Sequence, residues 1–282
     1  MNFTVVLGVD KKTIESLRLV WPTWRRFKPS LMSRPFVIFY NGVTEDQILS
    51  VIVPQWGDGD SAGYAPAFPA NIKLVPWPPR GVEYPRDGAT KWTNPQRAMM
   101  LAGFVHVPVT TVETPYWLKL DLDAVAIGMD DWVDPTWFEP VADSERLWRP
   151  QRPSIIAPGW NYSKPAQQML ALDEWAACAK PWFFDGTAPL DLRPEPGSEI
   201  VRHQRICSWC AFFHTTFTIE CSHAATQSCG RGQIPVDSQD GFHFYCAHRG
   251  RFSIRRVPMK QYGWKVRHSV NAVRDTVREI MS

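Results

Sequence analysis

The sequence lacks any long hydrophobic run and any strong excess of one charge. No window approaches the roughly 20 apolar residues that a membrane-spanning helix requires. The formal net charge of +3 is too small to indicate nucleic-acid binding through charge alone. The first residues, MNFTVVLGVDKK, have an apolar stretch too short for a signal peptide and no basic leader. We therefore expect a cytoplasmic protein with no membrane span and no nucleic-acid partner.

Cysteine is present without a clear framework. Of the six cysteines, Cys207 and Cys210 form a C-x-x-C, but no second pair with that spacing follows. Zinc sites of this type usually need two such pairs, so the sequence neither predicts nor excludes a structural zinc. A disulfide is no more expected, because a cytoplasmic chain is kept reduced. The 282 residues contain neither an internal repeat nor a low-complexity tract, and this length suits a single domain.

Tryptophan, in contrast, is abundant. The chain has 14 of them. A tryptophan offers a flat apolar face with one polar group, which suits the face of a sugar ring. For any single tryptophan, however, we expect a role in the core.

Apolar patterns in the first half of the chain alternate between the periods of strands and helices. Strands are expected at 3–9, 36–40, 72–75 and 117–127, and helices at 11–21, 44–52 and 94–105. Pro22 is expected to end the first helix, and Thr44 with Gln47 forms a capping-box pattern. Such alternation predicts a mostly parallel α/β sheet flanked by helices. Ligands of such sheets bind at the carboxyl ends of the strands, where Asp10 and Asn41 stand.

The second half is less regular. Segments 141–165 and 180–203 are rich in proline, glycine and polar residues, and long loops in a compact domain are usually functional or disordered. Their aromatic residues favour ordered loops. Beyond them the patterns predict strands at 206–219 and 251–257 and helices at 237–248 and 270–280.

Two carboxylates interrupt the fourth expected strand. Asp121 and Asp123 follow the apolar run 116–118, and the chain becomes apolar again at 124–127. Residues two apart in an extended chain point to opposite faces, so the pair acts together only if the strand bends there. Desolvating an unpaired charge is costly, which favours a functional site over two surface acids. Such a pair can hold Mg²⁺ or Mn²⁺ and leave coordination positions for substrate phosphates.

With this pair after about four strands, the sequence resembles the GT-A class of nucleotide-sugar-dependent glycosyltransferases, in which an apolar strand ends in Asp-x-Asp. The resemblance implies a GT-A-like fold with a mostly parallel central sheet, flanking helices and an irregular acceptor-side lobe. The single domain, 1–282, would comprise a nucleotide-sugar-binding half, 1–128, and an acceptor-binding half, 129–282, with a C-terminal helix. The implied activity is hexosyl transfer, with Mn²⁺ or Mg²⁺ as cofactor, a nucleoside-diphosphate sugar as donor, and an unknown glycan or small molecule as acceptor.

Residues upstream of the pair match positions that contact the donor in this class. Lys91, Asn94 and Arg97 surround the start of the helix before the motif strand, where basic and amide residues touch the sugar or the diphosphate. Capping and solvated charge explain these residues equally well. Asp10 and Asn41 complete the expected substrate-binding set, together with Asp121.

Residues downstream match two further positions of the class. Asp240 would take the proton of the acceptor hydroxyl in an inverting enzyme, or contact the sugar in a retaining one, while Asp237 is the expected helix cap. His268 matches a histidine that many members return to the metal. The resemblance thus implies metal ligands Asp121, Asp123 and His268, with Asp121 binding through water or contacting the ribose. The lysines and arginines of 249–267 would neutralise the leaving diphosphate or form a solvated face.

Two other interpretations remain. Asp121-Leu-Asp123-Ala-Val125 also fits the signature of haloacid-dehalogenase-like phosphatases, with Asp121 as nucleophile and Asp123 as acid/base. That family carries the motif on its first strand and later supplies a Gly-Asp, and no Gly-Asp follows here. A non-enzymatic, zinc-stabilised binding module would use the cysteine-rich segment and the basic tail, but it leaves the aspartate pair unused.

Overall fold

The computed structural model describes residues 1–53, 70–77, 94–128, 132–140, 152–158, 160–162, 170–171, 204–206, 209–227, 233–234, 243, 246–247, 252–257, 262–267 and 269–281. Within these, the backbone alone is described at 94–102, 160–162, 170–171, 204–206, 223–227 and 233–234. In the described part of the chain, none of the helices combines the length and hydrophobicity of a membrane span.

Seven strands form the central sheet. They are β1 (Phe3–Asp10), β2 (Phe36–Asn41), β3 (Ile72–Pro76), β4 (Tyr116–Leu120), β6 (Ile155–Ala157), β10 (Cys210–His214) and β12 (Ile254–Arg256). Their spatial order is β12-β6-β10-β4-β1-β2-β3. β1 to β4 are parallel, and β10 runs antiparallel to both β4 and β6. The expected mostly parallel sheet is therefore confirmed, with β10 as its reversed strand.

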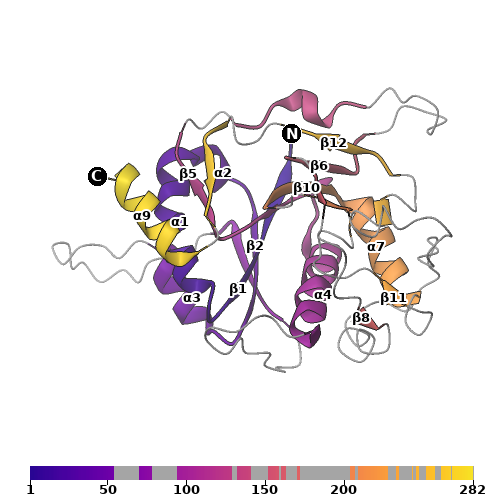
Figure 1. The fold of residues 1–282 in the computed structure, drawn as a ribbon, viewed down its shortest axis with the longest axis horizontal. Helices are drawn as coiled ribbons and strands as arrows, with labels where there is room; N and C mark the ends of the chain where they lie inside the picture. Colours follow the sequence, from indigo (N-terminus) through magenta and orange to yellow (C-terminus); the bar gives the residue numbers. More distant parts are fainter. Residues whose placement is uncertain are drawn as a thin grey trace.

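Helices cover both faces of this sheet (Figure 1). Its helices are α1 (Ile14–Phe27), α2 (Pro29–Met32), α3 (Glu45–Ile52), α4 (Asn94–Thr111), α7 (Thr215–Gln227), α9 (Val270–Met281) and the 3-10 turn η1 (Pro135–Phe138). α1 packs with α3 and α9 on one face, and α4 packs with α7 on the other. Short strands pair outside the sheet: β5 (Ala124–Ala126) with β13 (Trp264–Val266), β7 (Trp160–Tyr162) with β9 (Gln204–Ile206), and β8 (Leu170–Ala171) with β11 (Gln233–Ile234).

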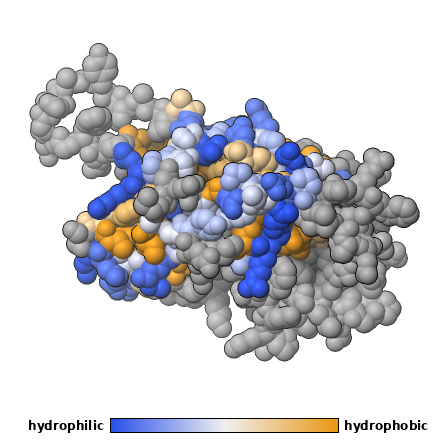
Figure 2. Space-filling view, turned by 90° about the horizontal axis from the view of Figure 1, so that it is seen from above, coloured by the Kyte–Doolittle hydropathy of each residue, from blue (hydrophilic) through white to orange (hydrophobic). Residues whose placement is uncertain are grey.

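Side-chain alternation along the strands gives each face its own apolar layer. On β4, Leu118 and Leu120 belong to the core beneath α1, with Leu17 and Trp24 of that helix. Trp117 points to the opposite face, where its Nε1–H donates to Thr218 Oγ1 of α7 at 2.8 Å. Seen from above, the described surface carries hydrophobic residues interspersed among hydrophilic ones (Figure 2).

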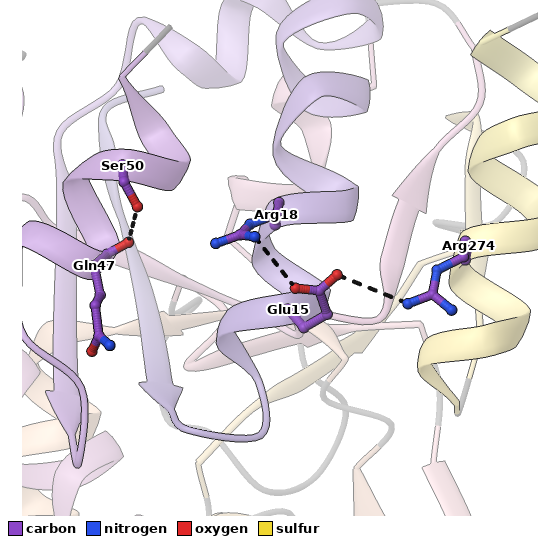
Figure 3. A network of polar contacts seen from close by, with 5 residues as sticks. All are labelled: Glu15, Arg18, Gln47, Ser50 and Arg274. Carbon is purple, nitrogen blue, oxygen red and sulfur yellow. Dashed lines mark hydrogen bonds and ion pairs between the residues drawn. The ribbon is translucent and has the colours of Figure 1, made fainter. Parts of the chain in front are cut away.

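Helix α9 is fixed to α1 by polar contacts as well as by packing. Glu15 of α1 lies between Arg18 and Arg274, with carboxylate-to-guanidinium distances of 3.8 and 3.9 Å (Figure 3). These groups are roughly half exposed, so the pairs contribute little energy. Burial of Val273 beneath the helix supplies the larger share. The final helix predicted at 270–280 is confirmed.

Two predicted helix ends are wrong. Pro22 lies inside α1 on its exposed side, and Trp24 beyond it is fully buried. An internal proline costs about 3 kcal/mol, and burial of one large aromatic side chain is of similar size, so the helix continues. For the same reason α4 passes Pro108 and ends at Thr111 rather than near 105, with Val107 buried. The capping box at Thr44 and Gln47 is present as predicted.

Two predicted strands are each divided. The strand expected at 117–127 consists of β4 and β5, and the turn between them contains both aspartates. The strand expected at 206–219 ends at His214, and 215–227 is helix α7. The threonines of this segment favour a strand in the sequence pattern. In the structure, Thr215 begins the helix, and its Oγ1 donates to the carbonyl oxygen of Thr114 at 2.7 Å. The irregular segment 141–165 contributes strand β6 to the main sheet, which its composition did not predict.

Candidate functional site at the carboxyl edge of the sheet

Hydrogen bonds join the ends of β1, β2 and β3 at one edge of the sheet. Asp10 and Asn41 are register partners on neighbouring strands. The side-chain amide of Asn41 donates to the carbonyl oxygen of Trp77 at 2.9 Å, and the backbone N–H of Trp77 donates to Tyr40 at 2.9 Å. The two expected substrate-binding residues are therefore neighbours at the edge where parallel sheets bind ligands.

Asp10 has a clear local role. Its Oδ1 accepts hydrogen bonds from the backbone N–H of Lys12 at 3.0 Å and of Thr13 at 2.8 Å, and from Thr13 Oγ1 at 2.8 Å. The side chain thus stabilises the turn from β1 into α1. Substrate contact by Asp10 stays a prediction, as does that by Asn41.

The aspartate pair lies in the bend that the sequence pattern required. The backbone N–H of Asp121 donates to Trp209 at 2.8 Å, and that of Ala124 donates back to Asp121 at 3.1 Å. The chain then leaves the sheet as β5, held by Trp24 Nε1–H donating to the carbonyl oxygen of Ala124 at 2.7 Å. Both aspartates are half-buried, so the bend brings two carboxylates to the carboxyl edge, with Oδ1 of Asp123 buried.

Lys119 is a charged residue of this site that the sequence patterns did not reveal. Its side chain is only 4% exposed, yet its ammonium forms an ion pair with Oδ1 of Asp121, whose side chain is 38% exposed. The ammonium also lies 5.2 Å from the ring centre of Phe104 on α4. A lysine in the middle of an otherwise apolar strand was the available signal, because such a charge is buried only with a partner.

His243 lies on the same face of the sheet. Its ring centre is 4.5 Å from that of Phe213 and 6.4 Å from that of Trp117. Burial and then the charge of Lys119 lower the pKa of His243 from 6.5 to about 3. The imidazole is therefore neutral at physiological pH, and His243 packs against Trp117 of β4 and Phe213 of β10. Asp240 itself lies outside the described residues.

The C-terminal segment returns to the aspartate bend. β13 pairs antiparallel with β5, and the backbone N–H of Arg267 donates to the carbonyl oxygen of Asp123 at 3.0 Å. Gly263 has a positive φ of 76° and approaches Gly128 so closely that a Cβ would meet its Cα at 2.9 Å. The buried Lys28 donates to the carbonyl oxygen of Tyr262 at 2.7 Å. His268 lies outside the described residues, but Arg267 directly before it is hydrogen-bonded to Asp123, a candidate metal ligand.

The first turns of helix α4 lie toward the same edge. Near its end, Thr114 Oγ1 hydrogen-bonds Thr4 at the start of β1, whereas Gly103 packs on Phe39 and on Trp77 just after β3. Asn94 begins the helix nine residues before Gly103, or about 13 Å further along the axis at 1.5 Å per residue. Asn94 and Arg97 therefore lie on the end of α4 that is nearer the carboxyl edge. Lys91 lies outside the described residues.

The donor set fits a divalent cation shared with a substrate. No group of three or more metal-ligating side chains occurs among the residues that the structure describes. The bend offers two carboxylates, and Mg²⁺ in particular is commonly bound by one or two carboxylates plus substrate phosphates and water. Cys210, Cys221 and Cys246 are buried, and the other cysteines of the zinc alternative lie outside the described residues.

Comparisons with known proteins give similarity of fold only. No family model and no curated protein matches the sequence. Solved structures that match include the galactosyltransferase LgtC with donor and acceptor sugar analogues (11% identity, 90% of this chain and 73% of that chain, TM-score 0.45). Core-mannan synthase A from Aspergillus fumigatus in its Mn/GDP form also matches (10%, 88% and 69%, TM-score 0.48). The bifunctional glycosyltransferase WbbM matches at 10% identity and TM-score 0.45, and this chain covers 44% of it. Since the TM-scores of these structures are below 0.5, a functional proposal depends on this chain's own residues.

Proposed function

We propose that this protein is a metal-dependent glycosyltransferase that moves a sugar from a nucleoside-diphosphate sugar to an acceptor hydroxyl. One observation carries the proposal: Asp121 and Asp123 occupy a bend at the carboxyl edge of the sheet, and the C-terminal segment is hydrogen-bonded to Asp123. That arrangement is suited to a cation that a diphosphate shares. The resemblance of the Asp-x-Asp pattern to GT-A enzymes supports the same function.

Each candidate residue has a place in this proposal. Asp123 and His268 would hold Mn²⁺ or Mg²⁺, and Asp121 would contact the ribose or metal-bound water. The bound cation would supply charge stabilisation for the departing diphosphate. Asn94 and Arg97 stand on the end of α4 nearer the carboxyl edge, which supports contact with the donor, and Lys91 precedes them.

The acceptor would bind in the half formed by 129–282. Asp240 is the candidate for deprotonating the acceptor hydroxyl if configuration is inverted, or for contacting the sugar if it is retained. His243, three residues later in sequence, is anchored on Phe213 and beside Lys119. This anchoring supports a position for Asp240 near the acidic bend.

The test is binding measured by calorimetry. A panel of UDP, GDP, ADP and CDP, with and without Mn²⁺, should give at least one nucleotide that binds only with the metal. Asp123→Ala should abolish that binding while the circular dichroism spectrum is unchanged. Asp275→Ala is the matched control, because Asp275 is 75% exposed on α9 and pairs only weakly with Arg278 at 4.0 Å.

Two results would contradict the proposal. One is equal affinity of the parent and Asp123→Ala for the metal–nucleotide pair. The other is hydrolysis of an aryl phosphate that Asp121→Asn abolishes, because that loss is the signature of the phosphatase alternative.

A further inference from the structure

Lys119 is an ionic group placed where stability alone does not require one. Its strand neighbours Leu118 and Leu120 are fully buried apolar residues, and Lys119 itself is 3% exposed as a residue. Replacing a buried ion pair with apolar residues of similar volume is often neutral or stabilising. A methionine would fill the space beside Phe104 without the cost of desolvating an ammonium.

The ammonium reaches the acidic bend directly. It pairs with Oδ1 of Asp121, and Asp121 is two residues from the candidate metal ligand Asp123. The nearby His243 is neutral, as its lowered pKa indicates. Arg267 directs its Nε to Thr276 on α9 at 2.9 Å. Lys119 therefore brings a positive charge to the bend.

This charge changes what the bend prefers to bind. Taken by themselves, the carboxylates of Asp121 and Asp123 and the ammonium of Lys119 sum to a formal charge of about −1. A divalent cation alone brings the bend to about +1, whereas without the ammonium it would reach about zero. A positive bend attracts a diphosphate, and a neutral one does so much less.

We propose that Lys119 is a positioning residue that weakens the binding of a bare divalent cation and strengthens the binding of the cation together with a diphosphate. It holds the carboxylate of Asp121 in place and contributes the positive charge that makes the metal site depend on the nucleotide. The part that concerns the diphosphate rests on the proposed function, and the part that concerns the bare cation does not.

The experiment compares Lys119→Met with the parent in two titrations. Mn²⁺ alone is followed by electron paramagnetic resonance, and Mn²⁺ with the best nucleotide of the panel above by calorimetry. Lys119→Met should bind bare Mn²⁺ about tenfold more tightly, because a repelling charge is gone, and the Mn²⁺–nucleotide pair about tenfold more weakly. Lys119→Gln, which is also uncharged, should shift both constants in the same directions and serves if the methionine variant fails to fold.

Lys28→Met is the matched control for loss of a buried lysine. Lys28 is also fully buried, but its ammonium donates to the carbonyl oxygen of Tyr262 and lies 5.4 Å from the ring centre of Trp264. Lys28→Met should lower both affinities if it loosens the fold, and should leave both unchanged if it does not. Opposite shifts are expected only for substitutions at Lys119.

The outcomes separate this inference from the proposed function. If both constants of Lys119→Met move in the same direction or stay unchanged, Lys119 has only a structural role and the inference is overturned. Failure of the parent to bind any nucleotide with Mn²⁺ would remove the proposed function. Tighter binding of bare Mn²⁺ by Lys119→Met would still support the charge effect in that case, and unchanged binding would overturn it as well.

Discussion

The backbone N–H of Arg267 donates to the carbonyl oxygen of Asp123 at 3.0 Å. This bond joins the last strand of the chain to the aspartate bend, although nothing in the local sequence brings the two segments together. The β5–β13 pairing that contains it is the reason that a C-terminal residue can take part in a site built on β4.

The first prediction concerns the residue next to Arg267. His268→Ala should weaken the binding of the Mn²⁺–nucleotide pair by at least about tenfold, within the 10–100-fold range of losses at metal sites, and leave the melting temperature nearly unchanged. Calorimetry and a thermal melt measure the two effects. Asn271→Ala is the control, because Asn271 is exposed on α9 and contacts only Arg274 at 3.3 Å. Unchanged affinity in His268→Ala would mean that the metal has another third ligand or none.

The second prediction concerns the close approach of two glycines. Gly263→Ala should lower the free energy of unfolding by about 2 kcal/mol, because alanine strains the positive φ and its Cβ meets the backbone of Gly128 at 2.9 Å. The variant should also bind the Mn²⁺–nucleotide pair more weakly, since β13 positions the segment beside Asp123. Urea unfolding and calorimetry test both effects.

Gly42→Ala is the matched control for Gly263. Its φ is 65°, but the nearest atoms to a new Cβ are side-chain carbons of Lys11 at 3.4 Å or more. It should cost about 1 kcal/mol from backbone strain alone and keep the metal–nucleotide affinity. Equal losses of affinity in the two variants would show that β13 does not position the site.

The local patterns predicted the first half of the fold well, and particular residues show why the rest was missed. The capping box at Thr44 and the strand ends depend on residues close together in sequence, so the sequence predicted them. The division of 117–127 depends on Trp24 and on β13, which lie far away in sequence. An apolar run on both sides of Asp121 and Asp123 therefore looked like a single strand.

The candidate site was only partly predictable for a related reason. Residue types and order identified the two aspartates, but not which groups contact them. The direction of the Lys119 side chain depends on the pleat of β4 and on Phe104 of α4. The helix 215–227 was missed because Thr218 serves as the acceptor for Trp117 rather than as a strand residue.

The third prediction is a pH dependence of stability from His243. Its pKa in the folded protein is about 3 against 6.5 ordinarily, because it is buried and near Lys119. The unfolded chain therefore takes up a proton below about pH 6.5 while the folded protein does not, so the free energy of unfolding falls as pH falls. The slope should approach about 1.4 kcal/mol per pH unit below pH 6.

Urea unfolding between pH 7 and pH 5 measures this slope. Burial also lowers the pKa of His106 and of His214, so they add to the effect. His243→Leu removes one titrating group and should flatten the slope by up to about 1.4 kcal/mol per unit. The same slope in His243→Leu as in the parent would exclude a buried neutral imidazole at this position.

The fourth prediction concerns the buried thiols of α7 and the segment after His243. Burial, then a hydrogen bond to its neighbour Cys246, raises the pKa of the Cys221 thiol well above its usual range. Since the thiolate is the reactive form, both cysteines should resist alkylation in the native protein and react in urea. Peptide mass spectrometry after labelling assigns each site separately. Rapid native labelling of Cys221 would contradict the packing of α7 described here.

The last prediction concerns Asp240 and separates the two stereochemical outcomes. If the enzyme inverts, Asp240→Asn should keep the affinity for the donor and lose transfer by at least about a hundredfold, the usual scale of a general base. The amide has the size of the carboxylate but cannot accept the acceptor's proton. If the enzyme retains configuration, the carboxylate contacts the sugar, and donor affinity should fall together with the rate. Asp237→Asn is the control, because the expected helix cap tolerates asparagine. Single-turnover rates and donor calorimetry on both variants distinguish these cases, and a rate and an affinity both unchanged in Asp240→Asn would remove Asp240 from the site.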